Sequence, residues 1–384
     1  MSKISRLKID GFRRLRAIDL PTRPLTVLIG ANGVGKTSLL NALSLISASA
    51  AGGLNAQLSE LGGLTSVATR SPDTKELALL VEMEVPGHEP LEYQLSLVPK
   101  GAGYAIAQEV LSQAREGYEQ PFKHIDSRDG EIRYYRTDEP RGLVRPDWEH
   151  NPLESSLAQV PKMFRQPEEL RRILASASLY HVLDVGPRAP VKLPQQMKPA
   201  TLPGPNGSEL VPYLYYLREG EPARFEAIVD SLKAAFRDFE ALKFPPVAAG
   251  MLAMTWKDKG FPKPFYMHEL SEGTLRFLWL VALLQSPSLS TITMIDEPEV
   301  SLHPELLSLL ADLMREASQR THLVVATHSD RFIRFLRPEE VVVMDAGEDG
   351  LATATWADTL SLEAWLTEYG LDEVWRMGRM GGRS

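Results

Sequence analysis

The chain has 384 residues, of which 43% are apolar and 24% charged, and its formal net charge is −8. This composition allows one or two globular domains with a large core and excludes a uniformly basic, nucleic-acid-coating surface. The chain has no cysteine, which excludes disulfides and thiolate metal sites and fits a reducing, cytoplasmic location. No apolar run approaches the ~20 residues of a membrane helix, and the polar residues 1–6 do not resemble a signal peptide, so no membrane partner is expected.

The first part of the chain predicts two strands followed by a glycine-rich turn and a helix. Residues 3–9 have the spacing of a strand, and Leu25–Ile29 form a continuous apolar run. Residues 30–37 are G-A-N-G-V-G-K-T, and a helical pattern of apolar residues starts directly behind them. A strand, a G-x-x-x-x-G-K-T turn and a helix in this order are the context that a phosphate-binding loop requires.

The residue types of this turn predict a site for ATP and Mg²⁺. Glycines allow backbone N–H groups to surround the phosphates, and the N-terminus of the helix adds a partial positive charge. We expect Lys36 to reach the β- and γ-phosphates and the Thr37 hydroxyl to ligate Mg²⁺. The expected nucleotide contacts are Gly30, Asn32, Gly33, Gly35, Lys36, Thr37 and Ser38.

The next part of the chain predicts an antiparallel sheet. Residues 48–76 are rich in Gly, Ala, Ser and Thr and are expected to form a weakly structured loop. Apolar residues then alternate in 77–85 and again in 91–97, which predicts a hairpin, and runs at 104–111 and 131–136 extend the sheet. Residues 150–178 are expected to be partly helical, and six prolines predict an irregular linker over 184–206.

The last part predicts strands that alternate with helices, and hence a mostly parallel sheet. Apolar residues at helical spacing, with Pro222 in the first turn, predict a helix that reaches residue 239. The later expected segments are strands near 251–256 and 264–267, a helix over 274–285, buried strands at 291–296, 321–327 and 341–345, a helix over 304–318, and a helical tail from 346.

A second group of candidate residues follows these strands. Asp296 and Glu297 end a buried strand, where open α/β sheets bind ligands, so we expect Asp296 to hold Mg²⁺ and Glu297 to act as general base. Ser271 and Gly273 start a helix; they predict either an anion site or a simple N-cap. His328 ends the next strand, where it either contacts the γ-phosphate or is structural.

Together these motifs resemble those of the ABC-type ATPases. Residues 30–37 match Walker A, 270–273 the signature, Asp296 and Glu297 Walker B, 301–303 the D-loop, and His328 the switch histidine. The segments LSEGTLRF, IDEPEVSLHP and THS are similar to the RecF, SMC and OLD branch. The resemblance covers about residues 1–98 and 250–345.

This resemblance implies an α/β ABC-type ATPase head, with a mixed or parallel P-loop sheet, an antiparallel β lobe and a mixed, partly helical insert. The implied domains are lobe I over 1–98, the insert over 99–249, lobe II over 250–345 and a C-terminal helical tail over 346–384. In this family two heads dimerise around two ATP molecules, which implies that Ser271 and Gly273 of one copy touch the γ-phosphate held by Lys36 of the other. Lys36, Glu297 and His328 form the implied catalytic set.

The chain also departs from the family pattern. The glutamine of the Q-loop has no clear counterpart, although Gln57 is a candidate, and the signature differs from the Gly-Gly-Gln form of transporter ATPases. The insert lacks coiled-coil heptads, and too few residues follow 345 for a Toprim domain. The segment 12–14 lies where relatives contact the nucleotide base, although a merely basic surface loop is the alternative.

Two functions follow from the resemblance. The first is an ATPase that clamps or senses double-stranded DNA in repair, recombination or anti-phage defence, and arginines and aromatic residues within 133–148 support it. The alternative is a regulatory ATPase subunit that controls a partner effector, such as a nuclease or toxin, without binding DNA. A transporter subunit is a weaker third reading, because the signature and the insert differ.

Overall fold

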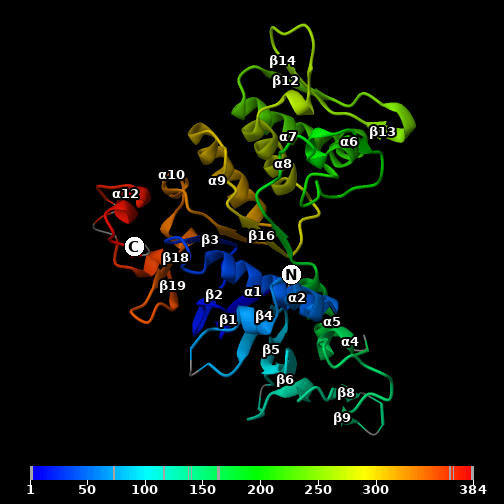
Figure 1. Ribbon diagram of the computed structural model, residues 1–384, viewed down its shortest axis with the longest axis vertical. Coiled ribbons are helices and arrows are strands. Elements are labelled where there is room, and N and C mark those ends of the chain that lie inside the picture. The colour runs from blue at the N-terminus through cyan, green and yellow to red at the C-terminus, as the bar shows by residue number, and fades with distance from the viewer. Residues whose placement is uncertain are drawn as a thin grey trace. The chain divides into compact units, whose positions relative to one another are not determined.

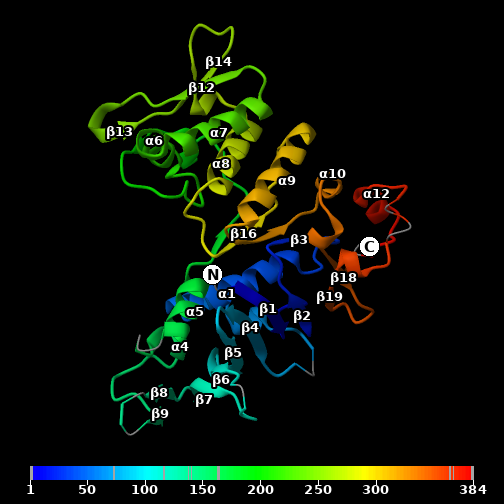
Figure 2. The same ribbon diagram turned by 180° about the vertical axis from the view of Figure 1, so that it is seen from behind.

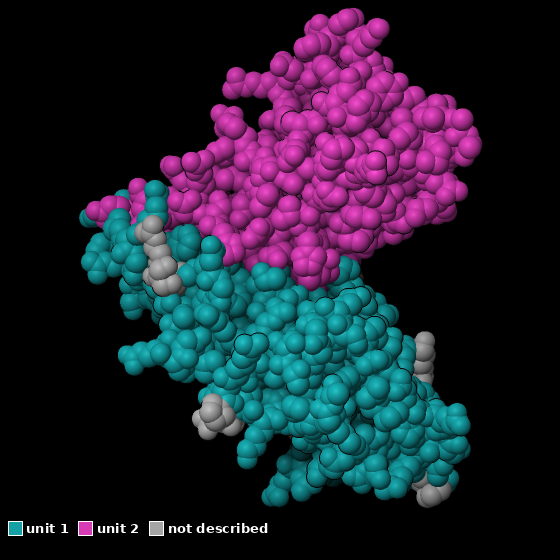
Figure 3. Space-filling view, in the orientation of Figure 1, with its two compact units in different colours: residues 1–178, 338–368, 374–384 teal, residues 179–337, 369–373 magenta. Residues whose placement is uncertain are grey.

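The computed structural model describes residues 3–71, 74–115, 117–136, 138–139, 141–161, 165–362, 365 and 367–381. The chain divides into two compact units, which are coloured separately in Figure 3. Unit 1 consists of residues 1–178, 338–368 and 374–384, and unit 2 consists of residues 179–337 and 369–373. Unit 1 is therefore assembled from both ends of the chain, whereas unit 2 comes mainly from its middle.

Unit 1 contains an eight-stranded antiparallel sheet in the order β2-β1-β4-β5-β6-β7-β8-β9. The strands are β1 Lys3–Asp10, β2 Ile18–Pro21, β4 Leu77–Val85, β5 His88–Lys100, β6 Gly103–Gln113, β7 Phe122–Arg128, β8 Tyr134–Arg136 and β9 Gly142–Val144. The expected hairpin is confirmed as β4 and β5, which pair antiparallel from Leu77 opposite Leu97. Alternate side chains of β4 are buried, because successive residues of a strand point to opposite faces.

The strand, turn and helix around the glycine-rich loop are also confirmed in unit 1. Strand β3 (Leu25–Ile29) is buried along its whole length and leads into helix α1 (Lys36–Ala51). Strand β18 (Val341–Ala346) runs parallel to β3, with Val341 opposite Val27, and β19 (Ala352–Trp356) pairs antiparallel with β18. Figures 1 and 2 show α1 crossing one face of the antiparallel sheet.

Two local expectations for unit 1 are wrong, and one strand was not expected. Residues 48–76 are not a loop: α1 continues to Ala51, and α2 (Leu54–Glu60) and α3 (Leu64–Val67) follow, because leucines one turn apart are buried. Strand β7 was not expected, because its buried residues include polar ones. The region after 346 begins with a strand, β19, rather than a helix. The other helices of unit 1 are α4 Ser156–Gln159 and α5 Arg165–Ala175.

Unit 2 contains the parallel strands β16 (Ile292–Asp296) and β17 (His322–Ala326), as expected, with Ile292 opposite His322. Strand β10 (Ser178–Tyr180), where the chain passes from unit 1 to unit 2, neighbours β16. The expected helices are confirmed as α8 (Glu272–Leu284) and α9 (Pro304–Ser318). Helix α8 is apolar on nearly every side, and almost all of its residues from Leu275 onward are therefore buried.

The rest of unit 2 consists of short elements around two further helices. Helix α6 (Leu210–Gly220) was not expected, and α7 (Pro222–Ala235) ends before Phe239, which instead starts strand β12. The remaining elements are β11 Gln195–Gln196, β12 Phe239–Lys243, β13 Met251–Leu252, β14 Thr255–Asp258, β15 Phe265–Tyr266, α10 Asp330–Ile333 and the 3₁₀ turns at Pro190–Lys192, Ala248–Gly250 and Met267–Glu269. The described elements also include two 3₁₀ turns in unit 1, Pro338–Glu340 and Ala357–Thr359, and helix α12 Leu371–Arg376.

A buried carboxylate in unit 1 fixes α4 against the sheet and α1. Glu109 accepts hydrogen bonds from the Tyr93 hydroxyl at 3.0 Å and from the backbone N–H groups of Ser156 and Leu157, the latter at 2.8 Å. Burial raises the pKa of Glu109, and the bonds from these two N–H groups act against that rise. The neighbouring Ser155 hydroxyl donates to the carbonyl of Ser49 at 2.7 Å. The network therefore connects the helix that follows the glycine-rich loop to the middle of unit 1.

His124 in β7 gives unit 1 a predicted acid sensitivity. Burial lowers the pKa of His124 from 6.5 to about 4, and Arg115 acts in the same direction. Between these two pKa values the unfolded chain binds a proton that the folded chain excludes, so stability falls as the pH drops, by at most about 1.4 kcal/mol per pH unit. We expect His124→Gln to flatten this slope in urea denaturation between pH 7 and pH 4.5. The exposed His88→Gln is the control, and an unchanged slope in His124→Gln would contradict the assignment.

No helix in the described part of the chain combines the length and the apolar character that crossing a lipid bilayer requires.

Candidate functional site

The glycine-rich loop of unit 1 has a backbone that only glycine fits. Gly30, Gly33 and Gly35 all have positive φ angles, of 149°, 75° and 127°. A Cβ atom on Gly30 would lie 2.2 Å from the carbonyl oxygen of Met344 in β18. The close approach of β18 and the left-handed backbone therefore both require glycine at the start of the loop.

Lys36 closes this loop on itself. Its side chain is buried, and Nζ donates hydrogen bonds to the carbonyls of Gly30 at 2.6 Å and Ala31 at 2.9 Å. Thr37 is exposed on the first turn of α1. Within the described residues no side chain caps this helix, whose N-cap is Gly35. The first N–H groups of α1 thus have the arrangement that binds anions at helix N-termini. Asn32 is exposed in the same loop and Ser38 is half-buried.

In unit 2 Asp296 is the last residue of β16 and Glu297 follows it with a strained backbone. Its φ is 51°, in the left-handed region where a residue other than glycine costs on the order of 1–3 kcal/mol. Its N–H donates to the carbonyl of Ala326 at the end of β17, at 2.8 Å. Such strain is typical of functional sites, and here the neighbouring strand holds it in place.

The structure brings His328 and Glu297 together and adds a histidine that the sequence did not indicate. Nε2 of His328 lies 3.4 Å from Oε1 of Glu297. Nδ1 of His181, which follows β10, lies 3.8 Å from Oδ2 of Asp296. A cavity of about 10 Å³ next to Asp296 and Glu297 has room for about one water molecule. His181 was missed because a single histidine far along the chain carries no spacing signal.

The signature segment and the D-loop lie in contact within unit 2. Ser271 caps α8 by accepting a hydrogen bond from the N–H of Thr274 at 3.1 Å, which confirms the N-cap interpretation, and its side chain remains exposed. A Cβ atom on Gly273 would lie 2.5 Å from the carbonyl oxygen of Ser301. Arg276 donates to the Ser301 hydroxyl and, at 3.1 Å, to the carbonyl of Leu183. Gly273 is thus needed for packing within one chain, independently of any contact with a second copy.

A third carboxylate, Glu299, was also missed by the sequence analysis. Its Oε1 accepts hydrogen bonds from the Thr327 hydroxyl at 2.5 Å and from the backbone N–H of His328 at 3.2 Å. Burial raises the pKa of Glu299, and these two bonds act against that rise. The segment D-E-P-E contains three acidic residues, and the third of them could have indicated that Glu299 belongs to the site.

Other candidate contacts are less favourable for ligand binding. Phe12 is completely buried, so its ring is part of the core rather than a contact for a nucleotide base. Gln57 lies half-buried in α2. Acidic neighbours partly neutralise the arginines in the aromatic segment, because Arg145 lies 2.7 Å from Glu131 and Arg141 3.6 Å from Glu139. Tyr134 and Trp148 pack against each other, with ring centroids 5.3 Å apart.

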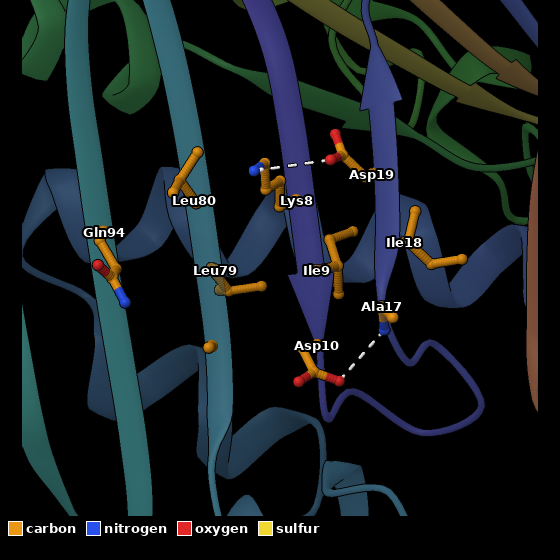
Figure 4. A pocket seen from close by; sticks show the side chains of 10 residues that line it. Lys8, Ile9, Asp10, Ala17, Ile18, Asp19, Leu79, Leu80 and Gln94 are labelled. Atoms are coloured by element: carbon orange, nitrogen blue, oxygen red, sulfur yellow. Dashed lines mark hydrogen bonds and ion pairs between the residues drawn. The ribbon is translucent and has the colours of Figure 1, made fainter.

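A cavity of about 340 Å³ opens on the antiparallel sheet of unit 1, between β1, β2, β4 and β5 (Figure 4). Its charged residues have partners within the sheet: Lys8 lies 3.6 Å from Asp19, and Asp10 accepts from the N–H of Ala17 at 3.2 Å. None of the lining residues is among those predicted for the nucleotide site. We therefore assign this cavity no part in nucleotide chemistry.

Comparison with known proteins gives the family and the fold. Residues 25–334 match the family described as "AAA domain, putative AbiEii toxin, Type IV TA system". A 43-residue segment is 49% identical to the OLD nuclease of Thermus scotoductus, and it spans 11% of this chain and 8% of that protein.

Two solved SMC heads are similar in fold. The SMC head bound to the C-winged helix domain of ScpA is 15% identical, with a TM-score of 0.56 over 92% of this chain and 97% of that chain. The Pyrococcus furiosus SMC head with an extended coiled coil is 14% identical, with a TM-score of 0.54 over 96% and 98%. The family match covers most of the chain, and the likeness to SMC heads confirms the expected mixed α/β head fold. The chain belongs to this AAA-domain family and is an ABC-type ATPase of the RecF, SMC and OLD type.

Proposed function

We propose that this chain binds and hydrolyses ATP with Mg²⁺, and that two copies dimerise around two ATP molecules. The observation that carries hydrolysis is the partly exposed carboxylate of Glu297, held at a strand end and 3.4 Å from His328. A carboxylate in this position can accept a proton from an attacking water, and a histidine beside it can orient the pair toward the γ-phosphate.

In this proposal the glycine-rich loop binds the phosphates and Glu297 supplies the base. Lys36 stabilises the charge of the β- and γ-phosphates, and the N–H groups of the loop bind the remaining phosphate oxygens. Thr37 and Asp296 fit Mg²⁺, because this ion usually takes one or two protein oxygens and completes its shell with phosphate oxygens and water. Bound Mg²⁺ would neutralise charge on the transferred phosphoryl group.

Dimerisation is expected to depend on the exposed start of α8, where Ser271 and Gly273 would meet the γ-phosphate of the other copy. Ser271→Arg should therefore abolish the ATP-dependent dimer and leave ATP binding by the single chain within about threefold, because the added side chain occupies the contact surface. Light scattering with Mg-ATP measures the first quantity and titration calorimetry the second. Thr355→Arg, which adds the same group at an exposed position of β19, is the control. A full-strength dimer of Ser271→Arg would rule out this contact.

As the substrate on which the dimer acts we propose double-stranded DNA, in repair, recombination or anti-phage defence. The support is the RecF, SMC and OLD type of the chain together with the arginines and aromatic residues of 133–148. The test is the mass in solution of the Glu297→Gln protein with Mg-ATP, first alone and then with a short DNA duplex. Retention of the duplex by the dimer, weakening steeply with salt, would support a clamp on DNA phosphates.

A regulatory role is the second candidate, and the paired arginines favour it. Arg141 and Arg145 have acidic neighbours, which reduces the positive potential available to DNA. The description of the family also names a toxin of a type IV toxin–antitoxin system. In this case the ATP-bound dimer would not bind DNA and would instead bind an effector protein, such as a nuclease or toxin. Co-purification of such a partner, lost on Ser271→Arg substitution, would distinguish it from a DNA clamp.

A further inference from the structure

Glu299 links the turn that carries Glu297 to the end of β17. Its Oε1 accepts from the hydroxyl of Thr327 at 2.5 Å and from the backbone N–H of His328 at 3.2 Å. Thr327 is completely buried, so its hydroxyl is shielded from solvent that could replace this bond. The same carboxylate oxygen therefore holds two consecutive residues, of which the second is the expected switch histidine.

The direction of these hydrogen bonds is fixed by their neighbours. The N–H of Ser329 donates to Oγ1 of Thr327 at 3.0 Å. A hydroxyl has one hydrogen to donate, and that of Thr327 points to Oε1 of Glu299, while the Thr327 oxygen accepts from Ser329. Leaving a buried hydrogen-bonding group without its partner is costly, so this buried link is well suited to hold a strand end in place.

Glu297 lies between the two ends of this link. Its N–H donates to Ala326 at 2.8 Å, and its carboxylate lies 3.4 Å from His328. The turn after β16 is thus attached to residues 326–328 by the backbone of Glu297, by its carboxylate and by the side chain of Glu299. Since φ of Glu297 is 51°, this backbone conformation is strained and needs such support.

We propose that Glu299 is a positioning residue, which through Thr327 sets the placement of His328 relative to the carboxylate of Glu297. This inference rests on the proposed role of Glu297 as general base. In this role Glu299 acts through its hydrogen bonds to Thr327 and to the backbone of His328, not by contact with the reacting atoms. A displacement of about 1 Å in a catalytic group can lower a rate about 10²-fold, so loosening this link should affect turnover rather than ATP binding.

The first test removes only the hydroxyl of Thr327. Thr327→Val keeps the shape of the side chain, and we expect it to lower kcat about 10- to 100-fold while the KM for ATP stays within about threefold. Thr327→Ser restores a donor and should recover most of the lost turnover. Thr293→Val changes another buried threonine, in β16, and serves as the control for the loss of a buried hydroxyl, with kcat within about twofold of the wild type.

A second test uses Glu299 directly and does not depend on the Thr327 variants. Glu299→Gln keeps an oxygen that can accept both bonds, whereas Glu299→Ala removes it, so kcat should fall in the order wild type, Gln, Ala, again with little change in KM. In a Glu297→Gln background, Glu299→Ala should cause no further loss in single-turnover rate, because groups that act as one unit are not additive. Thermal melting of each variant shows that the measured chain is folded.

The outcomes separate the inference from the function on which it rests. Wild-type turnover in Glu297→Gln would overturn the role of Glu297 as base, and with it this inference. A strong loss in Glu297→Gln together with wild-type kcat in Thr327→Val and Glu299→Ala would overturn the positioning role alone. The positioning role would also be overturned if Thr327→Ser were as slow as Thr327→Val. A further loss of rate on Glu299→Ala in the Glu297→Gln background would overturn it too.

Discussion

Glu297→Gln is expected to lower the ATP turnover number about 10²- to 10⁴-fold, the range that a general base contributes, while ATP remains bound. The amide has nearly the same shape as the carboxylate, and it can still occupy the left-handed backbone position. It cannot accept the proton of the attacking water. ATP therefore stays intact in the site, and the ATP-bound dimer should accumulate during size-exclusion chromatography with Mg-ATP.

The matched control for this change is Glu305→Gln, because Glu305 is an exposed acid at the start of α9. It removes the same charge outside the turn and should leave turnover within about twofold of the wild type. Normal turnover in Glu297→Gln would show that another group removes the proton. A slow but monomeric Glu297→Gln protein would separate hydrolysis from dimerisation and contradict the proposed cycle.

Lys36→Ala is expected to raise the dissociation constant for Mg-ATP by about 10²-fold or more. A hydrogen bond to a charged group contributes about 1.5–3 kcal/mol, and in our proposal Lys36 makes more than one bond to phosphate oxygens. Since Nζ of Lys36 also donates to the carbonyls of Gly30 and Ala31, the alanine variant also loosens the loop. Titration calorimetry with Mg-ATP measures the loss.

Lys36→Met separates these two effects. Methionine keeps most of the apolar stem and fits a helix, but it has no ammonium group. We expect it to lose ATP binding as strongly as Lys36→Ala does, with a melting temperature closer to that of the wild type. Tight ATP binding by Lys36→Met would refute the assignment of this lysine to the phosphates.

The sequence predicted best those elements whose signals are local. β3 follows from a continuous apolar run, α1 from a known loop pattern and α9 from apolar residues at helical spacing. Helix α2 was missed because its glycine-rich flanks resemble a loop, although Leu54 and Leu58 are one turn apart and buried. Strand β7 was missed because His124 and Asp126 are polar, and only tertiary contacts explain why they are buried.

In the candidate site, too, residues in local motifs were predicted and residues joined by tertiary contacts were not. Lys36, Asp296 and Glu297 belong to short motifs with a defined order along the chain, so their residue types and spacing were sufficient to select them. The link from Glu299 to Thr327 joins residues from two strand ends, and the contact of Gly273 with Ser301 joins a helix to a loop. Neither contact has a fixed spacing in the sequence. From the resemblance, the segment 12–14 was expected either near the nucleotide base or as a basic surface loop; Phe12 fits neither, because it is buried in the core.

The pairing of β3 with β18 has a consequence for synthesis on the ribosome. Val27 lies opposite Val341, so β3 leaves the ribosome long before β18, the strand with which it pairs along one edge. The antiparallel strands β4 to β7 are close together in sequence and can pair early, since closing a short loop costs less conformational entropy than closing a long one. During translation the apolar strand β3 therefore stays exposed until β18 is made, and an exposed apolar strand promotes aggregation. Ribosome-bound chains that stop before residue 338 should accordingly need more protection by chaperones than complete chains.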